Sequence, residues 1–158
     1  MEYTLITDIG NSQIEFAIFQ EEKLVGKTRI KTEKLHTEYD EKLLLNLLNE
    51  HNIKPADIKK GIIFSVVPHI TRLVQILIKG EVGIELPIFK TANLKDFKYA
   101  VDDINEVGHD IIADIVGAIH LFGYPCIISD LGTVTKNIIV DKDGVFQGVS
   151  FFHRSQLV

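Results

Sequence analysis

The sequence has 158 residues, 46% hydrophobic and 25% charged, which is enough for one substantial core or two small ones. Its net charge of -5 argues against a nucleic-acid surface, because such a surface needs a basic footprint. The single cysteine, Cys126, excludes an internal disulfide and favours a reducing cytoplasm. No basic region precedes the first apolar run, and polar residues interrupt the longest apolar tract, so we expect neither a secretory signal nor a membrane span.

The first two predicted strands flank a short polar turn. Residues 3–7 and 14–19 are apolar runs of strand length, and residues 8–12 lie between them. Backbone N–H groups and the Ser12 hydroxyl of such a turn can face phosphate oxygens, while the Asp8 carboxylate can hold a hydrated Mg²⁺. The turn is a candidate phosphate-binding loop, although an ordinary hairpin turn uses the same residue types.

Helices and strands then alternate. Leucines at helical spacing predict an amphipathic helix over residues 40–52, with Asp40 as its cap. Residues 61–67 form a nearly continuous apolar run, which is typical of a strand buried on both faces of a parallel sheet. A helix follows Pro68, and residues 86–89 predict a short strand. This order predicts a mixed sheet with antiparallel strands on one side and parallel crossovers on the other.

A second acidic turn follows in the last third of the chain. Residues 91–103 predict a polar connection, and residues 106–122 predict a helix capped by Asn105. Aligning Asp130 with Asp8 gives a strand, turn, strand, turn, strand pattern in both places without a gap. We therefore expect a duplicated domain that holds a nucleotide between its halves. Residues 1–104 would form the first half and residues 105–158 the start of an incomplete second half.

Four short motifs stand out along the chain, at residues 8–12, 65–68, 106–110 and 130–133. Together, and in this order, they resemble the type III pantothenate kinases, a family of the actin, sugar-kinase and Hsp70-like ATPase superfamily. The resemblance implies an α/β, ribonuclease H-like (actin-like ATPase) fold with a duplicated mixed sheet. It implies phosphoryl transfer from ATP to pantothenate, the first step towards coenzyme A. It also implies ATP with Mg²⁺, a monovalent cation (K⁺ or NH₄⁺) and a homodimer.

The resemblance also assigns roles to individual residues. Asp110 would be the proton acceptor, Asp130 would bind K⁺, and Asp8 would hold Mg²⁺ through water. The ATP-binding residues would be Asp8, Ile9, Gly10, Asn11, Ser12, Gln13, Ile14, Glu15 and Thr133. The substrate-binding residues would be Val101, Gly108, His109, Asp110 and Ile111.

Two departures from the family pattern leave a second hypothesis open. Ile111 stands where the family has an arginine, and Val101 stands where it has a substrate-contacting tyrosine. An arginine would help to hold an anionic substrate. The alternative to a kinase is therefore a catalytically impaired nucleotide-binding relative that acts as an accessory or regulatory protein. From the residues alone, Asp110 could also be a carboxylate that satisfies the first turn of its helix.

Overall fold

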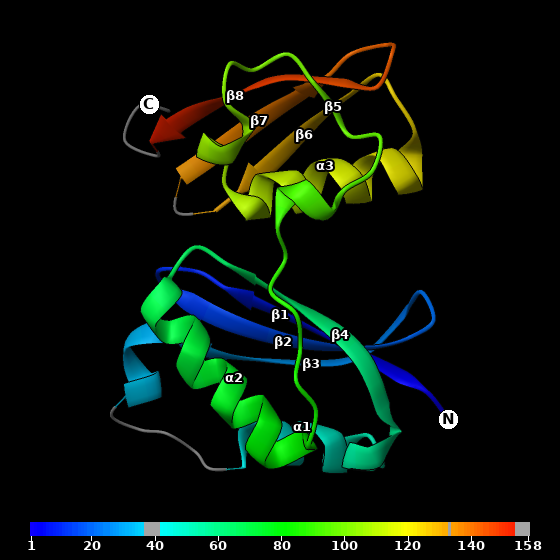
Figure 1. Cartoon of the computed structure of the whole chain (residues 1–158), viewed down its shortest axis with the longest axis vertical. Coiled ribbons are helices and arrows are strands. Elements are labelled where there is room, and N and C mark those ends of the chain that lie inside the picture. Colours follow the sequence, from blue (N-terminus) through cyan, green and yellow to red (C-terminus); the bar gives the residue numbers. More distant parts are fainter. Residues whose placement is uncertain (37–41, 133, 154–158) are drawn as a thin grey trace. The chain divides into compact units, whose positions relative to one another are not determined.

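A computed structural model describes residues 1–36, 42–132 and 134–153. The chain forms two compact units, Met1–Phe89 and Lys90–Val158. Each unit is built on a four-stranded sheet with helical segments (Figure 1). The predicted boundary between two duplicated halves, after residue 104, falls later in the chain than the division between these units and stays a prediction.

The first unit contains the predicted mixed sheet. Its strands are β1 (Tyr3–Ile9), β2 (Gln13–Gln20), β3 (Lys23–Lys31) and β4 (Ile58–Ser65), in the order β3-β2-β1-β4. The pairs β1–β2 and β2–β3 are antiparallel, and β1–β4 is parallel. The strand predicted at residues 86–89 is reduced to one parallel bridge between Ile63 and Ile88. The expected combination of hairpins and a parallel crossover is confirmed.

The helices of the first unit are α1 (Leu43–Glu50) and α2 (Pro68–Val82), with 3-10 turns at Thr32–His36 and Pro55–Asp57. The helix α1 is shorter than predicted, and its predicted cap, Asp40, lies outside the described residues. Its first turn is instead satisfied from α2, because Glu81 accepts hydrogen bonds from the backbone N–H groups of Leu44 (2.7 Å) and Leu45 (2.9 Å). The two helices are therefore joined by a carboxylate at a helix N-terminus.

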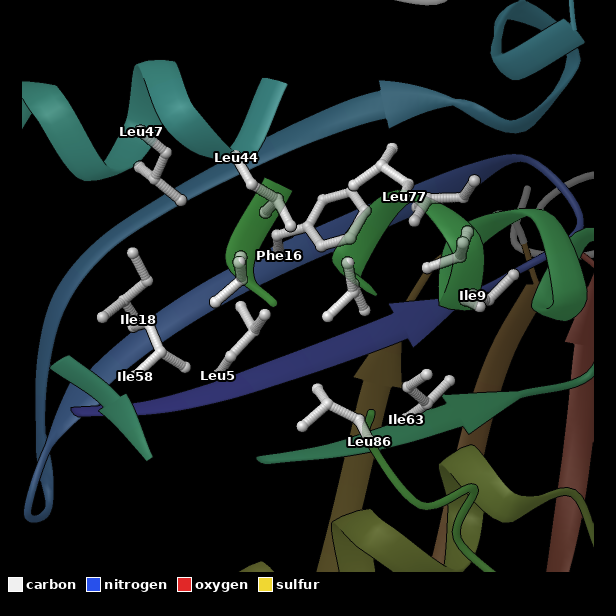
Figure 2. Packing of buried hydrophobic residues seen from close by; sticks show 14 of the residues in the cluster. Leu5, Ile9, Phe16, Ile18, Leu44, Leu47, Ile58, Ile63, Leu77 and Leu86 are labelled. Carbon is white, nitrogen blue, oxygen red and sulfur yellow. The ribbon is translucent and has the colours of Figure 1, made fainter. Parts of the chain in front are cut away.

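The first core lies between the sheet and these helices. Alternate residues of β1 and β2 point into it, as a strand's twofold side-chain period requires. Phe16 from β2 lies beside Leu44 of α1 and Leu77 of α2, and Leu5 and Ile63 extend the same layer (Figure 2). Each of these five side chains is at most 2% exposed.

The second unit has the sheet order β5-β8-β7-β6. Its elements are β5 (Lys98–Tyr99), α3 (His109–Phe122), β6 (Cys126–Leu131), β7 (Val134–Val140) and β8 (Val145–His153), with 3-10 turns at Thr91–Asn93 and Ile104–Glu106. The strand β5 pairs parallel to β8, and the other pairs are antiparallel. Ile111 and Ile115 of α3 pack with Ile138, Val140 and Phe146 of the sheet.

The helix α3 starts later than predicted. The side chain of Asp103 accepts a hydrogen bond from the backbone N–H of Asn105 (2.8 Å) and so stabilises a separate 3-10 turn. Val107 and Gly108 then adopt extended backbone angles, which end that turn before α3 begins. Asn105 as the cap of a continuous helix was therefore a wrong prediction.

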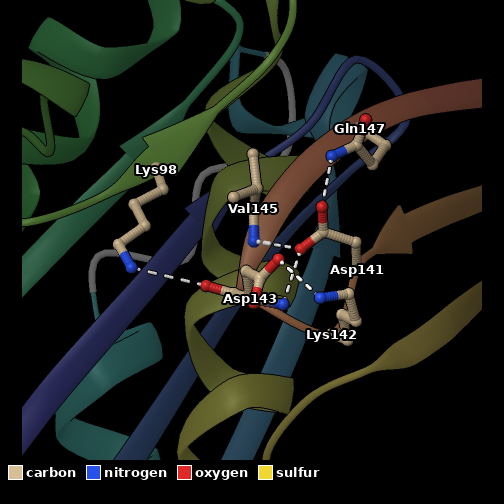
Figure 3. A network of polar contacts seen from close by, with 6 residues as sticks. All are labelled: Lys98, Asp141, Lys142, Asp143, Val145 and Gln147. Carbon is tan, nitrogen blue, oxygen red and sulfur yellow. Dashed lines mark hydrogen bonds and ion pairs between the residues drawn. The ribbon is translucent and has the colours of Figure 1, made fainter.

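The turn between β7 and β8 is organised by one carboxylate. Asp141 accepts hydrogen bonds from the N–H groups of Asp143 (2.9 Å) and Val145 (3.0 Å) and from the side-chain amide of Gln147 (2.6 Å). Lys98 of β5 donates to the Asp143 carbonyl at 3.4 Å (Figure 3). The bond from Val145 is the main cause that holds the pKa of Asp141 below its usual value.

The two acidic hairpins match in strand order but not in register. Asp8 pairs with Glu15, seven positions later, whereas Asp130 pairs with Lys136, six positions later. The ungapped alignment is therefore wrong by one residue at this turn. In both β2 and β7 the buried apolar residues have even numbers. A pairing that differs by one residue therefore reverses which side chains of the preceding strand, β1 or β6, face the core. Asp8 is consequently exposed, whereas the side chain of Asp130 is partly buried on the face that carries Ile128.

Candidate active site

The polar turn at residues 10–13 is held by hydrogen bonds within the first unit. Gly10 donates its backbone N–H to the carbonyl of Gln13 at 2.9 Å. Thr32, directly after β3, donates its hydroxyl to the Gly10 carbonyl (2.7 Å) and its N–H to the Ser12 carbonyl (3.0 Å). Thr32 is buried, so it fixes the turn from below the surface. Sequence reasoning missed this residue, since only the pairing of β2 with β3 brings it to the turn.

A cavity of about 330 Å³ opens beside this turn. It is lined by Asn11, Ser12 and Gln13 from the turn and by Lys31 and Glu33 from the end of β3. The Lys31 ammonium lies 3.6 Å from the Glu33 carboxylate, and its side chain is 62% exposed. An exposed cation beside small polar side chains suits a phosphate group. Lys31 was also missed, since in the sequence it is one of several scattered lysines.

The turn lies at the carboxyl ends of two parallel strands. Ile9 at the end of β1 pairs with Ser65 at the end of β4, and the N–H of Val66 donates to the Ile9 carbonyl at 3.1 Å. The Ser65 hydroxyl accepts from the N–H of Val67 (3.0 Å) and from the hydroxyl of Thr71 (2.6 Å), at the start of α2. Two of the sequence motifs therefore meet at the edge of the sheet where α/β proteins bind ligands.

The predicted ATP-binding residues divide by burial. Ile9 and Ile14 are fully buried in the core, so only their backbone could contact a ligand. The side chains of Asn11, Ser12 and Gln13 are exposed, as is that of Asp8 at the end of β1. Glu15 lies opposite Asp8 and 3.5 Å from the ammonium of Lys27. Thr133 lies outside the described residues.

A second group of charges forms in the other unit. Asp110 is in the first turn of α3, Asp130 is on β6, and Lys136 lies opposite Asp130 on β7. The Lys136 ammonium is 2.5 Å from Oδ2 of Asp110 and 2.9 Å from Oδ2 of Asp130. Burial would lower the pKa of Lys136, but its hydrogen bonds and attraction to both carboxylates outweigh this and raise it above its usual value. Sequence reasoning missed Lys136, because only the pairing of β6 with β7 places it opposite Asp130.

Three of the predicted substrate-binding residues, Gly108, His109 and Ile111, adjoin Asp110 in the sequence. Gly108 precedes α3, and a Cβ atom at this position would collide with Oδ1 of Asp110. His109 is half-buried at the first position of the helix. Ile111 is only 4% exposed and belongs to the core, and Val101 packs against the same cluster. Both side chains therefore contribute to the core of the second unit, and their predicted contact with the substrate stays a prediction.

The capacity to bind a metal ion differs between the polar turn beside Asp8 and the charged group of Asp110, Asp130 and Lys136. Within the described ranges, no three or more His, Cys, Asp or Glu side chains converge as ligands. Mg²⁺ in kinases is bound by one or two carboxylates, with water and substrate phosphates completing its shell, so the exposed Asp8 fits that ion. Between Asp110 and Asp130, in contrast, the Lys136 ammonium already supplies the positive charge. Across the described segments, no helix is long and apolar enough to cross a bilayer.

Two solved structures share the fold over nearly the whole chain. Component A of the (R)-2-hydroxyglutaryl-CoA dehydratase from Acidaminococcus fermentans matches with a TM-score of 0.57 at 14% identity, covering 98% of this chain and 48% of that one. The ethanolamine utilization protein EutJ from Carboxydothermus hydrogenoformans matches with a TM-score of 0.53 at 12% identity, covering 99% and 54%. At these identities the likeness concerns the fold alone. The predicted α/β, actin-like ATPase fold is confirmed.

Sequence comparison is more specific. The type III pantothenate kinases of Listeria innocua and Agathobacter rectalis are 32% and 34% identical to this chain over 146 residues. The aligned region covers 91% of this chain and 56% of each relative, so the chain spans little more than half the length of these proteins. The family model described as type III pantothenate kinase matches residues 4–151. The chain belongs to the type III pantothenate kinase family.

Proposed function

We propose that this protein takes part in the ATP-dependent phosphorylation of pantothenate, the first step of coenzyme A synthesis. Its family membership supports kinase chemistry with ATP and pantothenate as substrates. The chain spans 56% of the relatives' length, so we propose their complete kinase activity for this chain rather than infer it from family membership alone. We also propose that it acts in the cytoplasm as a homodimer, without nucleic acid or membrane partners.

The phosphate chain of ATP would bind at the turn of residues 10–13. The cavity beside Asn11 and Ser12, the nearby Lys31 cation and the position at the carboxyl ends of β1 and β4 support this assignment. Asp8 would hold hydrated Mg²⁺, which neutralises the phosphate charge during transfer. Phosphoryl transfer depends mainly on positioning and charge neutralisation, and these polar groups can supply both.

Asp110 would accept the proton of the pantothenate hydroxyl. The observation that carries the proposal is that Asp110 and Asp130, which are twenty positions apart, converge on the same ammonium group. The contact with Lys136 uses Oδ2 of Asp110, while Oδ1 lies against Gly108, the residue proposed to border the substrate together with His109. Because Gly108 has no side chain, there is space next to Oδ1. We therefore propose that Oδ1 is the oxygen that accepts the proton of the pantothenate hydroxyl.

A non-catalytic, nucleotide-binding accessory role is the second candidate. The observation that favours it is that the residue directly after Asp110 is a buried isoleucine, Ile111. An apolar side chain cannot hold an anionic substrate through charge, as an arginine would. The two candidates share ATP binding at the turn and differ in whether Asp110 has a chemical role.

A turnover assay with ATP, Mg²⁺ and pantothenate separates the two candidates. We expect phosphopantothenate to form and Asp110→Asn to lower kcat by about 10²-fold or more, the usual contribution of a general base. Asp143→Asn is the matched control, because Asp143 is an exposed acid in a turn of the same unit. ATP binding without product, measured by calorimetry at high protein concentration, would refute the kinase and favour the accessory role.

A further inference from the structure

One lysine joins Asp110, the proton acceptor of the proposed function, to Asp130, to which the family resemblance gives a monovalent cation. Lys136 contacts Asp110 and Asp130 at 2.5 and 2.9 Å, although these acids come from a helix and a strand. The Lys136 side chain is 18% exposed. Four lysines that pair with carboxylates elsewhere in the described chain are 54–82% exposed: Lys27, Lys31, Lys79 and Lys142. Lys136 is therefore held in place far more than an ordinary surface cation.

The position of this ammonium follows from the backbone. Lys136 lies directly opposite Asp130 in the antiparallel β6–β7 ladder, where cross-strand side chains are close neighbours. Asp110 approaches from the first turn of α3, which packs against this sheet. Because the lysine comes from the sheet itself, no diffusing ion is needed to place one positive charge between the two carboxylates.

An ammonium group and a monovalent metal ion would compete for this place. Each carries one positive charge and interacts with carboxylate oxygens, so a cation bound by Asp130 on the side of Asp110 would meet the charge and volume of Lys136. The residues present thus do not fit the K⁺ ion that the family resemblance implies at Asp130. They fit a site in which the cation is part of the chain.

We propose that Lys136 is the built-in cation of this site: its ammonium group bridges Asp110 and Asp130, supplies one positive charge between them and takes the place of a monovalent cation. The proposal rests on the proposed function for the role of Asp110. The occupancy of the site by lysine can be tested without any kinase activity. The protein should therefore neither bind K⁺ or NH₄⁺ at Asp130 nor require either ion.

The first experiment measures cation binding directly. The melting temperature of the protein is recorded in KCl and in tetramethylammonium chloride at equal ionic strength, and Tl⁺ binding is followed by ²⁰⁵Tl NMR as a probe for K⁺. We expect no difference between the salts and no saturable Tl⁺ binding for the unmodified protein. Lys136→Ala should melt at a lower temperature in tetramethylammonium chloride and gain saturable stabilisation by K⁺, because removing the ammonium leaves two carboxylates without their cation.

Two control variants separate charge replacement from general destabilisation. Lys136→Arg keeps a positive charge and should remain insensitive to K⁺. Lys142→Ala removes an exposed lysine of the same unit and should behave like the unmodified protein. If Lys136→Ala fails to fold, the unmodified protein still provides a test, since a Lys136 ammonium ¹⁵N resonance that shifts saturably with K⁺ would overturn the proposal.

Other results would also overturn it. Saturable Tl⁺ binding by the unmodified protein that Asp130→Asn abolishes would show that the metal site exists alongside Lys136. A folded Lys136→Ala protein without any K⁺-specific stabilisation would show that the lysine does not stand in for a cation. If the protein proves to have no kinase activity, the proposed function fails, while the binding measurements still decide the role of Lys136.

Discussion

Removing the Glu81 carboxylate should destabilise the first unit by about 3 kcal/mol. Glu81→Ala deletes two hydrogen bonds to a charged acceptor, at 2.7 and 2.9 Å, from the first turn of α1. A hydrogen bond to a charged group contributes about 1.5–3 kcal/mol, and the lower value applies here because Glu81 is only half-buried. The helix α1 has no side-chain cap at its own N-terminal residue that could replace Glu81. Glu81→Gln should cost about 1 kcal/mol, since its amide oxygen can still accept while the favourable charge at the helix N-terminus is lost.

Urea unfolding followed by NMR peak intensities can test this, because amides of β1–β4 and of β6–β8 report on the two units separately. Glu85→Ala is the matched control: its carboxylate pairs with Lys79 at the surface and its side chain is 81% exposed, so its loss should cost less than about 1 kcal/mol. The reasoning is refuted if Glu81→Ala and Glu85→Ala are equally stable. It is also refuted if the α1 amides keep full protection from hydrogen exchange in Glu81→Ala.

Three further changes have specific expected results. Gly61→Ala places a Cβ on the backbone carbonyl of Leu5 in the neighbouring strand, so β1 and β4 must separate. We expect the free energy of unfolding in urea to fall by about 3 kcal/mol, and an unchanged midpoint would contradict the close approach. Gly108→Ala should displace the Asp110 carboxylate and lower kcat in the pantothenate assay by about tenfold or more. The free energy of unfolding should change by less than about 1 kcal/mol. Turnover at the wild-type rate would contradict the geometry assigned to Asp110. The pKa of Asp141 is lowered in the folded state, so its stabilising effect should be present above about pH 4 and disappear as the pH falls through the folded pKa. The difference in melting temperature between wild type and Asp141→Asn should therefore shrink in acid, and a constant difference would contradict the shift.

Most of the element order was predictable from patterns in the sequence. The apolar runs of β1, β2 and β4 have the length of strands, and the leucines of α1 recur at helical spacing. The errors lie where local hydrogen bonds compete. Asp103 diverts the chain into a 3-10 turn before α3, and β5 has only two residues, too few for a periodic pattern to emerge.

The candidate site was predictable only in part. The motifs identified Asp8, Asp110 and Asp130 as the carboxylates of interest, because polar residues between apolar strands or at a helix start are visible in one dimension. Thr32 and Lys136 could not be found that way, since each reaches its place through pairing with a neighbouring strand. The role of each aspartate stays a prediction that the proposed assays can test.

The sequence by itself determined the fold class and the family, because hydrophobic periodicity and short polar motifs depend only on the order of residues. Tertiary structure decided which way the second acidic turn faces. Pairing in the β6–β7 hairpin is one residue shorter than in β1–β2, and this slip turns Asp130 towards the packed face and sets Lys136 opposite it. Strand register depends on the turn and on packing of the buried face together, so spacing along the chain could not reveal that the two acids share a lysine.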